Sequence, residues 1–307
     1  METQAPYLVT TTMLRNLRSA LLVAVLLLLP AVSQAQSMTE EQRAEAMRHL
    51  HWLPSETYKL PASNSALALP SGYHAVLGED ARRFITLSGE PSDPATEAVI
   101  LSPKFDDEII FESANEGYVS LDDWKDIDPT VMIDSIRRNT EEANKTRVQQ
   151  GIEEVHVVGW LQEPTLDRQT STVYWAIEGA TNSGHIVNSI ALRLGRNGYE
   201  RLNWVTDKAR YAPIGGQLDL MLRAHSFEPG ARYSDHLPGD KTAAYTIAGL
   251  VAAVAGAKVI KAVAGVGLLV LFKKLSVLIF GAFAAALYKL KALFRRDPGS
   301  GAPRSST

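Results

Sequence analysis

The chain has 307 residues, of which 46% are apolar and 21% are charged, and this balance excludes both an intrinsically disordered protein and a polytopic transporter. The net charge is −3 and the basic residues form no aromatic-interleaved patch, so no nucleic acid partner is expected. The sequence contains no cysteine, which excludes disulfides, thiolate metal sites, iron–sulfur clusters and cysteine nucleophiles.

The N-terminal residues have the pattern of a secretory signal peptide. Two arginines precede a short apolar run at residues 20–29, and a small-residue segment then leads to Ala35. This order predicts residues 1–35 as a signal peptide that is cleaved between Ala35 and Gln36. A retained signal anchor is the alternative, although a spanning helix needs roughly twenty apolar residues. A start at Met13 would give a more ordinary basic region, so the true start stays open.

Residues 36–241 are predicted to form one extracytoplasmic domain. Thr39 and Gln42 have the spacing of a capping box, which predicts a helix through about residue 53. Asp128 followed by Pro129 is a good helix start, and the helix that it opens should extend to about residue 150. Between these helices, short strand-like runs lie at residues 65–69, 73–77, 98–101 and 109–113.

After the second helix the apolar pattern changes from a helical period to a period of two. Strand-length runs lie at residues 155–160, 172–177, 186–194 and 199–205. Turn-forming residues join these runs, and Asn197-Gly198 is typical of a hairpin. We expect a four-stranded antiparallel meander, followed by a helix at about residues 214–224. Strands that are grouped apart from helices favour an α+β fold over a parallel α/β fold.

Residues 242–290 are predicted to anchor the protein in the membrane. The longest run without a charge, residues 242–257, would be about 24 Å long as a helix. It could cross a bilayer if Lys258 and Lys261 reached one interface, so we expect one transmembrane helix within residues 242–261. Residues 275–288 could instead form a second short span or an interfacial helix.

The orientation follows from the basic residues after the first apolar run, because lysines and arginines are retained on the cytoplasmic side. The sequence thus predicts an inner-membrane anchor in the lipid bilayer, with the main domain in the periplasm. Residues 291–307 would be a cytoplasmic tail, first basic and then disordered. Another envelope or membrane protein is a further candidate partner.

No enzyme signature, metal site or cofactor site is visible in the sequence, and no catalytic residue is predicted. Neighbouring acids could do acid–base chemistry if a cleft drove their pKa values apart, which makes an envelope hydrolase the alternative function. Adjacent acids on loops and helix surfaces are more often solvated charge. The acidic pairs are Asp106 with Asp107, Asp122 with Asp123, and Glu141 with Glu142.

Aromatic residues gather in the predicted meander, where they would form cross-strand core pairs or an exposed platform for a peptide, glycan or lipid. A polar segment immediately before the predicted anchor would either set the height of the domain above the bilayer or contact a membrane partner. The candidate interaction residues are Trp160, Tyr174, Trp175, Arg232, Tyr233 and Asp235.

Several separate motifs, in this order and spacing, resemble those of one family. They are Asn-Glu-Gly-Tyr-Val at 115–119, Glu-Glu-Ala-Asn at 141–144, Val-Gly-Trp at 158–160, Val-Tyr-Trp at 173–175, Leu-Gly-Arg at 194–196 and Arg-Tyr-x-Asp at 232–235. The family is the bacterial membrane-anchored proteins of domain-of-unknown-function family 2167. The resemblance implies export and anchoring, and it supplies no catalytic residue. We therefore expect a membrane-anchored cell-envelope protein of the binding or interaction type.

Overall fold

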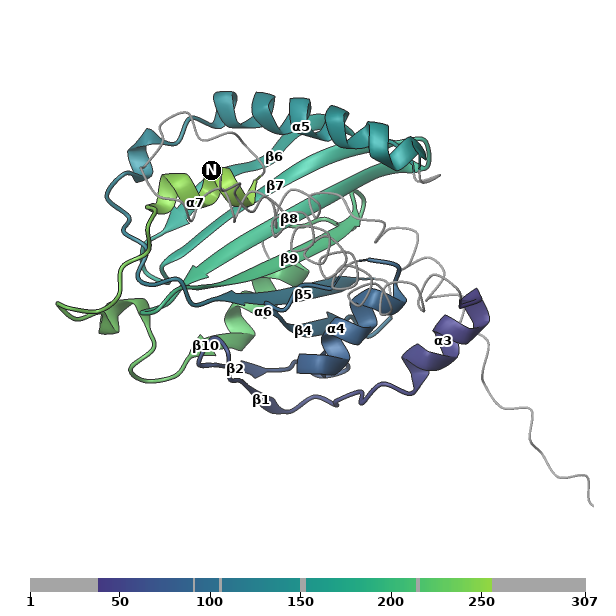
Figure 1. The fold of residues 1–307 in the computed structure, drawn as a ribbon, viewed down its shortest axis with the longest axis horizontal. Coiled ribbons are helices and arrows are strands. Elements are labelled where there is room, and N and C mark those ends of the chain that lie inside the picture. Colours follow the sequence, from purple (N-terminus) through teal and green to yellow (C-terminus); the bar gives the residue numbers. More distant parts are fainter. Residues whose placement is uncertain (1–37, 91, 105–106, 150–152, 214–215, 256–307) are drawn as a thin grey trace, which may run out of the picture.

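The computed structural model describes residues 38–255, except residues 91, 105–106, 150–152 and 214–215. At its centre is a seven-stranded antiparallel sheet with the strand order β3-β4-β5-β9-β8-β7-β6 (Figure 1). A smaller sheet has the order β1-β2-β10. The large sheet consists of β3 (His74–Leu77), β4 (Thr96–Leu101), β5 (Glu108–Ala114), β6 (His156–Asp167), β7 (Thr172–Thr181), β8 (Gly184–Leu194) and β9 (Tyr199–Asp207). The small sheet consists of β1 (Thr57–Leu60), β2 (Ser65–Ala68) and β10 (His225–Phe227).

The described helices surround the large sheet. They are α3 (Glu40–Arg48), α4 (Gly78–Leu87), α5 (Pro129–Gln149), α6 (Gln217–Ala224) and α7 (Ile247–Val254), with short 3₁₀ turns η1 (Trp124–Asp126) and η2 (Tyr233–Asp235). The α+β class with antiparallel sheets is confirmed, as is the four-stranded meander β6-β7-β8-β9. The helix expected through about residue 53 ends earlier, at Arg48. The sequence patterns did not indicate β1, α4 or β10.

Strand β5 joins the N-terminal strands to the meander by pairing with β9. Glu108 lies opposite Val205 and Ala114 lies opposite Tyr199, so the two strands match along their length. These partners are 85 to 97 positions apart in the chain (199 − 114 and 205 − 108), and local sequence patterns carry no information on such a distant pairing. The pairing makes one continuous sheet of strands that otherwise look like two separate groups.

One face of the large sheet carries the main hydrophobic core. Met132 and Ile136 of α5 pack against this face, together with Leu250 and Val251 of α7 and Trp175 of β7. Farther along the same face, α3 and α4 cover β3, β4 and β5 in an adjoining cluster. Figure 1 shows α5 and α7 over the meander and α4 over the other end of the sheet. This face is therefore covered over most of its length.

The opposite face is covered less completely. Met221 of α6 and Leu67 of β2 pack there on Leu202 and Trp204 of β9, and all four side chains are buried. Helix α6 has eight residues, which is a length of about 12 Å, and it is too short to cover strands of up to twelve residues. Part of the meander's second face therefore lies open beside α6.

The predicted N-cap of the long helix α5 is confirmed. One carboxylate oxygen of Asp128 accepts hydrogen bonds from the backbone N–H groups of Thr130 (2.9 Å) and Val131 (3.1 Å). The Asp128→Ala variant should lose about 1 kcal/mol of unfolding free energy, because these donors would have water as their only partner. Urea denaturation followed by circular dichroism measures this loss. Asp126→Ala is the control, since Asp126 is exposed and does not cap a helix; it should change stability by less than about 0.5 kcal/mol.

Helix α7 is the part of the predicted membrane span that the structure describes. Its residues Ile247, Leu250 and Val251 are fully buried in the core, and the carboxylate of Asp123 accepts hydrogen bonds from the Thr246 hydroxyl and the Ala248 N–H. Among the described helices, none has the length and apolar character that a bilayer crossing requires. Residues 256–307 and the signal region 1–35 lie outside the described residues, so the anchor and the cleavage site stay predictions.

Candidate functional site: a groove between the sheet and helix α6

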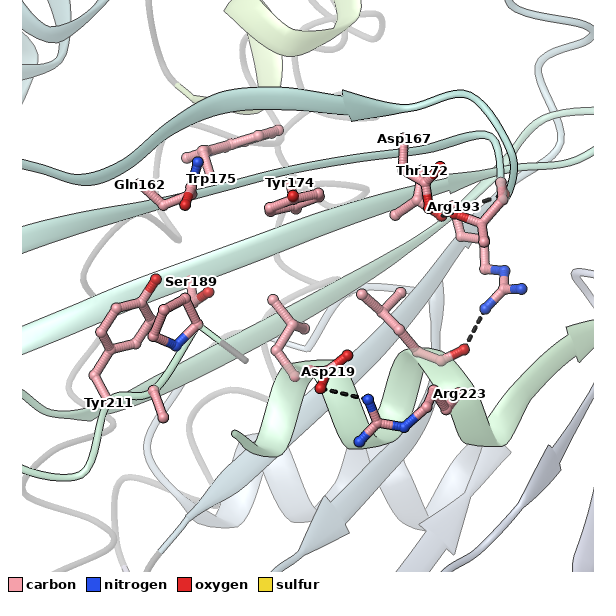
Figure 2. A pocket seen from close by; sticks show the side chains of 15 residues that line it. Gln162, Asp167, Thr172, Tyr174, Trp175, Ser189, Arg193, Tyr211, Asp219 and Arg223 are labelled. Atoms are coloured by element: carbon pink, nitrogen blue, oxygen red, sulfur yellow. Dashed lines mark hydrogen bonds and ion pairs between the residues drawn. The ribbon is translucent and has the colours of Figure 1, made fainter. Parts of the chain in front are cut away.

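A groove of about 740 Å³ lies on the partly covered face of the large sheet. Strands β6, β7 and β8 form one wall, and the segment after β9 together with α6 forms the other (Figure 2). The groove exists because α6 packs against β8 and β9 and leaves the neighbouring strands open. Its volume falls in the range of roughly 300–1,000 Å³ that is typical of ligand-binding sites.

Two tyrosines face each other across this groove. Tyr174 projects from β7, and Tyr211 comes from the segment after β9, where its ring packs on Trp204 with centroids 5.9 Å apart. Burial raises the pKa of Tyr211, and the nearby phenol of Tyr174 raises it further. The Tyr211 phenol is therefore protonated at neutral pH, so the groove offers a partly buried aromatic surface with a hydroxyl group that can donate and accept hydrogen bonds.

Arg193 provides a half-buried positive charge at one end of the groove. It projects from β8, and its guanidinium donates a hydrogen bond to the carbonyl oxygen of Leu222 in the last turn of α6. Burial lowers the pKa of Arg193, and the negative charge of Asp167 opposes this shift. An arginine remains protonated at neutral pH even so, so the end of the groove keeps a cation that has lost part of its hydration.

The remaining charged groups of the groove have protein partners. Arg223 forms an ion pair with Asp219 one turn earlier on α6. The carboxylate of Asp167 accepts hydrogen bonds from the Thr170 hydroxyl (2.7 Å) and the Gln169 N–H (2.8 Å), and the first of these bonds is the main cause that lowers the pKa of Asp167. The carboxylates of Asp219 and Asp167 thus stabilise neighbouring residues that line the groove.

Both polar and apolar residues line the groove. Its polar groups are hydroxyls, amides, guanidinium groups and carboxylates, and among its described lining residues there is no histidine, lysine or cysteine to serve as a base or nucleophile near neutral pH. In the described part of the chain, no group of three or more metal-binding side chains is close enough to hold an ion. The groove thus combines aromatic side chains, arginines and carboxylates.

Of the three candidate aromatics in the meander, only Tyr174 presents its side chain to the groove. Trp175 is the next residue, so its side chain lies on the opposite face of the sheet, where it is 1% exposed under α5 and α7. Trp160 packs against the same core, and its indole N–H donates a hydrogen bond to the carbonyl of Pro129 at the start of α5 (3.1 Å). The structure thus places Trp175 in the core and Trp160, which is partly buried, against it.

The other candidates, Arg232, Tyr233 and Asp235, lie in a segment that pairs with Gly195 at the end of β8, and they do not line the groove. The Tyr233 ring stacks on Tyr118 with centroids 4.6 Å apart, and its hydroxyl donates to the Val119 carbonyl (2.9 Å). Asp235 accepts hydrogen bonds from the backbone N–H groups of Gly230 and Arg232. The side chain of Arg232 is exposed. An interaction role for this segment stays a prediction.

The acidic pairs do not form a common site. Asp107 is buried and accepts hydrogen bonds from the Trp204 indole and the Thr206 hydroxyl, while Asp106 lies outside the described residues. Asp123 holds the start of α7 while Asp122 is exposed, and Glu141 and Glu142 pair separately with His156 and Lys145. The described acids of these pairs either have structural partners or lie in solvent, and none lines the groove.

Comparison with known families decides the identity of the chain. The family described as "Protein of unknown function (DUF2167)" matches residues 54–284, about three quarters of the sequence. The chain belongs to this family. No curated protein matches this DUF2167 protein. Similar solved structures include the solution structure of cyanobacterial PsbP (CyanoP) from Synechocystis sp. PCC 6803, with 14% identity, a TM-score of 0.34, and coverage of 56% of this chain and 92% of that chain.

Sequence reasoning did not single out Arg193, Tyr211 or Arg223, which line the groove of this DUF2167 protein. One signal was available for Arg193, because it is the one charged residue in the otherwise apolar or small run at 186–194. A charged residue in an otherwise apolar strand indicates either the edge of a sheet or a binding site. Tyr211 follows the meander in a segment without regular structure, and its position over Trp204 depends on the tertiary fold.

Proposed function

We propose that this DUF2167 protein is a membrane-anchored protein of the cell envelope whose folded domain binds a ligand or partner in the groove beside α6. The observation that carries this proposal is the groove itself. It combines a volume of about 740 Å³ with two opposed tyrosines and a partly dehydrated arginine. Aromatic residues and arginine are the residue types that contribute most to binding energy at interfaces.

The proposed location rests on the sequence. The signal-peptide pattern at residues 1–35 and the apolar stretch that continues to residue 288 favour export of the domain and retention of the C-terminal residues in the inner membrane. The lipid bilayer is thus one proposed partner, and another envelope or membrane protein is a second. Because residues 242–255 contribute to the core of the domain, a transmembrane helix would have to use apolar residues after residue 255 as well.

The topology can be measured with reporters fused after Arg296. We expect green fluorescent protein to fluoresce there and alkaline phosphatase to be inactive, because one span leaves the basic tail in the cytoplasm. The same pair of reporters fused after Lys241 should give the reverse result. An active phosphatase at Arg296 would contradict the single span and favour a hairpin of two short helices.

The groove can be tested by site-specific photocrosslinking in living cells. Benzoyl-phenylalanine at Gln162, which lines the groove, should form adducts that mass spectrometry identifies. The matched control is the same probe at Val158, which lies on the same strand, is 48% exposed and is not part of the groove. If both positions gave the same adducts, or if position 162 gave none, the groove would not be the binding site.

A further inference from the structure

We infer that the ligand of the groove carries a carboxylate, which binds the guanidinium of Arg193, on a peptide-like body that lies between Tyr174 and Tyr211. This inference rests on the proposed function, because it names the class of ligand for the same groove. Three observations support it: the unused donors of Arg193, the internal pairing of the other charges, and the residues that line the rest of the groove.

The first observation concerns the hydrogen-bonding capacity of Arg193. A guanidinium has five N–H donors, and the Leu222 carbonyl is the one acceptor that they bond within the described residues. The side chain is half-buried, so part of its hydration is already lost in the folded domain. An anion placed against the remaining donors would replace that hydration with charge-assisted hydrogen bonds, which are the strongest kind available to a ligand.

The second observation is that the other charges of the groove are matched within the protein. Arg223 is paired with Asp219, and Asp167 accepts hydrogen bonds from its own turn. A ligand cation would therefore have to compete with existing partners, whereas a ligand anion finds donors available at Arg193. The planar fork of a guanidinium matches the paired oxygens of a carboxylate or a phosphate, so it favours an oxyanion at the end of the groove. The choice of a carboxylate follows from the body of the ligand.

The third observation concerns the body of the ligand. Besides Arg193, the groove is lined by apolar side chains, including Leu218 and Pro213, and by the rings of Tyr174 and Tyr211. The hydroxyl of Ser189 and the amide of Gln162 lie on the same wall as Tyr174 and can bond amide groups. A chain of amides with apolar side chains and a free terminal carboxylate satisfies all of these surfaces together.

The experiment uses the purified full-length protein and three small-molecule probes that each carry a phenyl group. N-acetyl-phenylalanyl-alanine supplies a free carboxylate, its C-terminal amide lacks the charge, and phenyl phosphate supplies a different anion. Isothermal titration should show that the carboxylate binds at least about tenfold more tightly than the amide, since hydrogen bonds to a charged group contribute about 1.5–3 kcal/mol. Phenyl phosphate should bind more weakly than the carboxylate.

Variants assign the effect to Arg193. Arg193→Gln should abolish the preference for the carboxylate over the amide. The control Arg83→Gln should keep it, because Arg83 is exposed on α4 and does not line the groove. Thermal melting first shows that each variant is folded, and if Arg193→Gln is not, Arg193→Lys replaces it, because lysine keeps the charge but loses the bidentate fork and should lower the preference several-fold.

The outcomes separate this inference from the proposed function. Equal binding of the carboxylate and the amide would overturn the carboxylate assignment but leave the groove as a binding site. Tighter binding of phenyl phosphate would assign the end of the groove to phosphate esters. If none of the three probes bound while photocrosslinking at position 162 still gave specific adducts, the peptide-like class would be wrong and the proposed function would stand.

Discussion

The Gly198→Ala variant is expected to be unfolded or severely destabilised under conditions where the wild-type domain is folded. A Cβ atom at position 198 would lie 1.7 Å from the carbonyl oxygen of Ala114, at a backbone φ of +156°. Both atoms of this clash belong to backbone or Cβ, so no side chain can rotate to relieve it. The expected loss of unfolding free energy exceeds about 4 kcal/mol, which is exceptional for a single substitution.

The backbone at Gly198 cannot easily move away from Ala114. The Gly195 N–H donates to the carbonyl of Gly198 (2.8 Å), and the Gly117 N–H donates to the carbonyl of Asn197 (2.9 Å). The turn therefore joins the β8-β9 hairpin to the end of β5, and a shift would break the pairing that unites the two halves of the sheet. Soluble yield and urea denaturation followed by circular dichroism measure the loss.

Gly184→Ala is the matched control for this prediction. Gly184 also lies at a hairpin turn, between β7 and β8, and also has a positive φ of +138°, but a Cβ atom there would meet nothing within 4 Å. This control should lose only about 1–2 kcal/mol, the cost of a strained backbone conformation without a clash. Equal losses in the two variants would show that the clash is relieved and that φ alone determines the cost.

The sequence predicted those parts of the fold that depend on neighbouring residues. The four strands of the meander follow from their period of two, and the start of α5 follows from the chemistry of Asp128. Helix α4 was missed because its N-cap position is Leu77, whose side chain makes no capping hydrogen bond, and because its first residue is Gly78. Local signals predict an element only where the local chain itself stabilises that element.

Helix α7 shows a different limit. The residues around Ile247 and Leu250 are apolar on nearly every side, and such a composition suits a bilayer and a protein core equally well. In the structure these residues are buried against α5 and the sheet. What distinguishes the two environments is whether the sheet offers an uncovered face, and this is a property of the tertiary structure.

The sequence could predict the orientation of some residues of the candidate site, but not which face of the sheet is open. Alternation along β7 requires Tyr174 and Trp175 to face opposite sides of the sheet, so the sequence could place one of them in the core and the other outside it. Which face is open depends on the length and position of α6, and Arg193 becomes part of a groove only because α6 ends beside it. The sequence shows these residue types, but only the tertiary structure brings them together in one groove.

The Glu108→Gln variant is expected to be more stable than the wild-type protein at pH 8 and equally stable near pH 4.5. Glu108 is buried on β5, and neither oxygen of its carboxyl group has a hydrogen-bond partner among the described residues. Burial raises the pKa of Glu108 to about 8, and the charge of Glu90 adds to this effect. Glutamine has the shape of the protonated acid and cannot ionise.

The direction of the pH dependence follows from the two states of the chain. In the unfolded chain Glu108 has its ordinary pKa, so it releases its proton near pH 4.5, whereas the folded domain retains the proton up to about pH 8. The stability contributed by the protonated group is full below pH 4.5 and is lost as the pH rises to about 8. Over this window the loss is on the order of 4–5 kcal/mol at most, since one pKa unit corresponds to about 1.4 kcal/mol.

Urea denaturation of both proteins between pH 4.5 and pH 8.5 tests this prediction, and the difference between them isolates Glu108 from the other titrating groups. Glu200 is also buried and its pKa is also raised, so the wild-type curve alone would not show which residue causes the change of unfolding free energy with pH.

Glu112→Gln is a control on the same strand and face, because Glu112 forms a buried ion pair with Arg201. It should be less stable than wild type at every pH in this range, by about 3–5 kcal/mol, since it leaves the buried guanidinium without its counter-charge. If Glu108→Gln were also destabilised at pH 8, Glu108 would have to be ionised and paired in the folded protein, contrary to its environment in the structure.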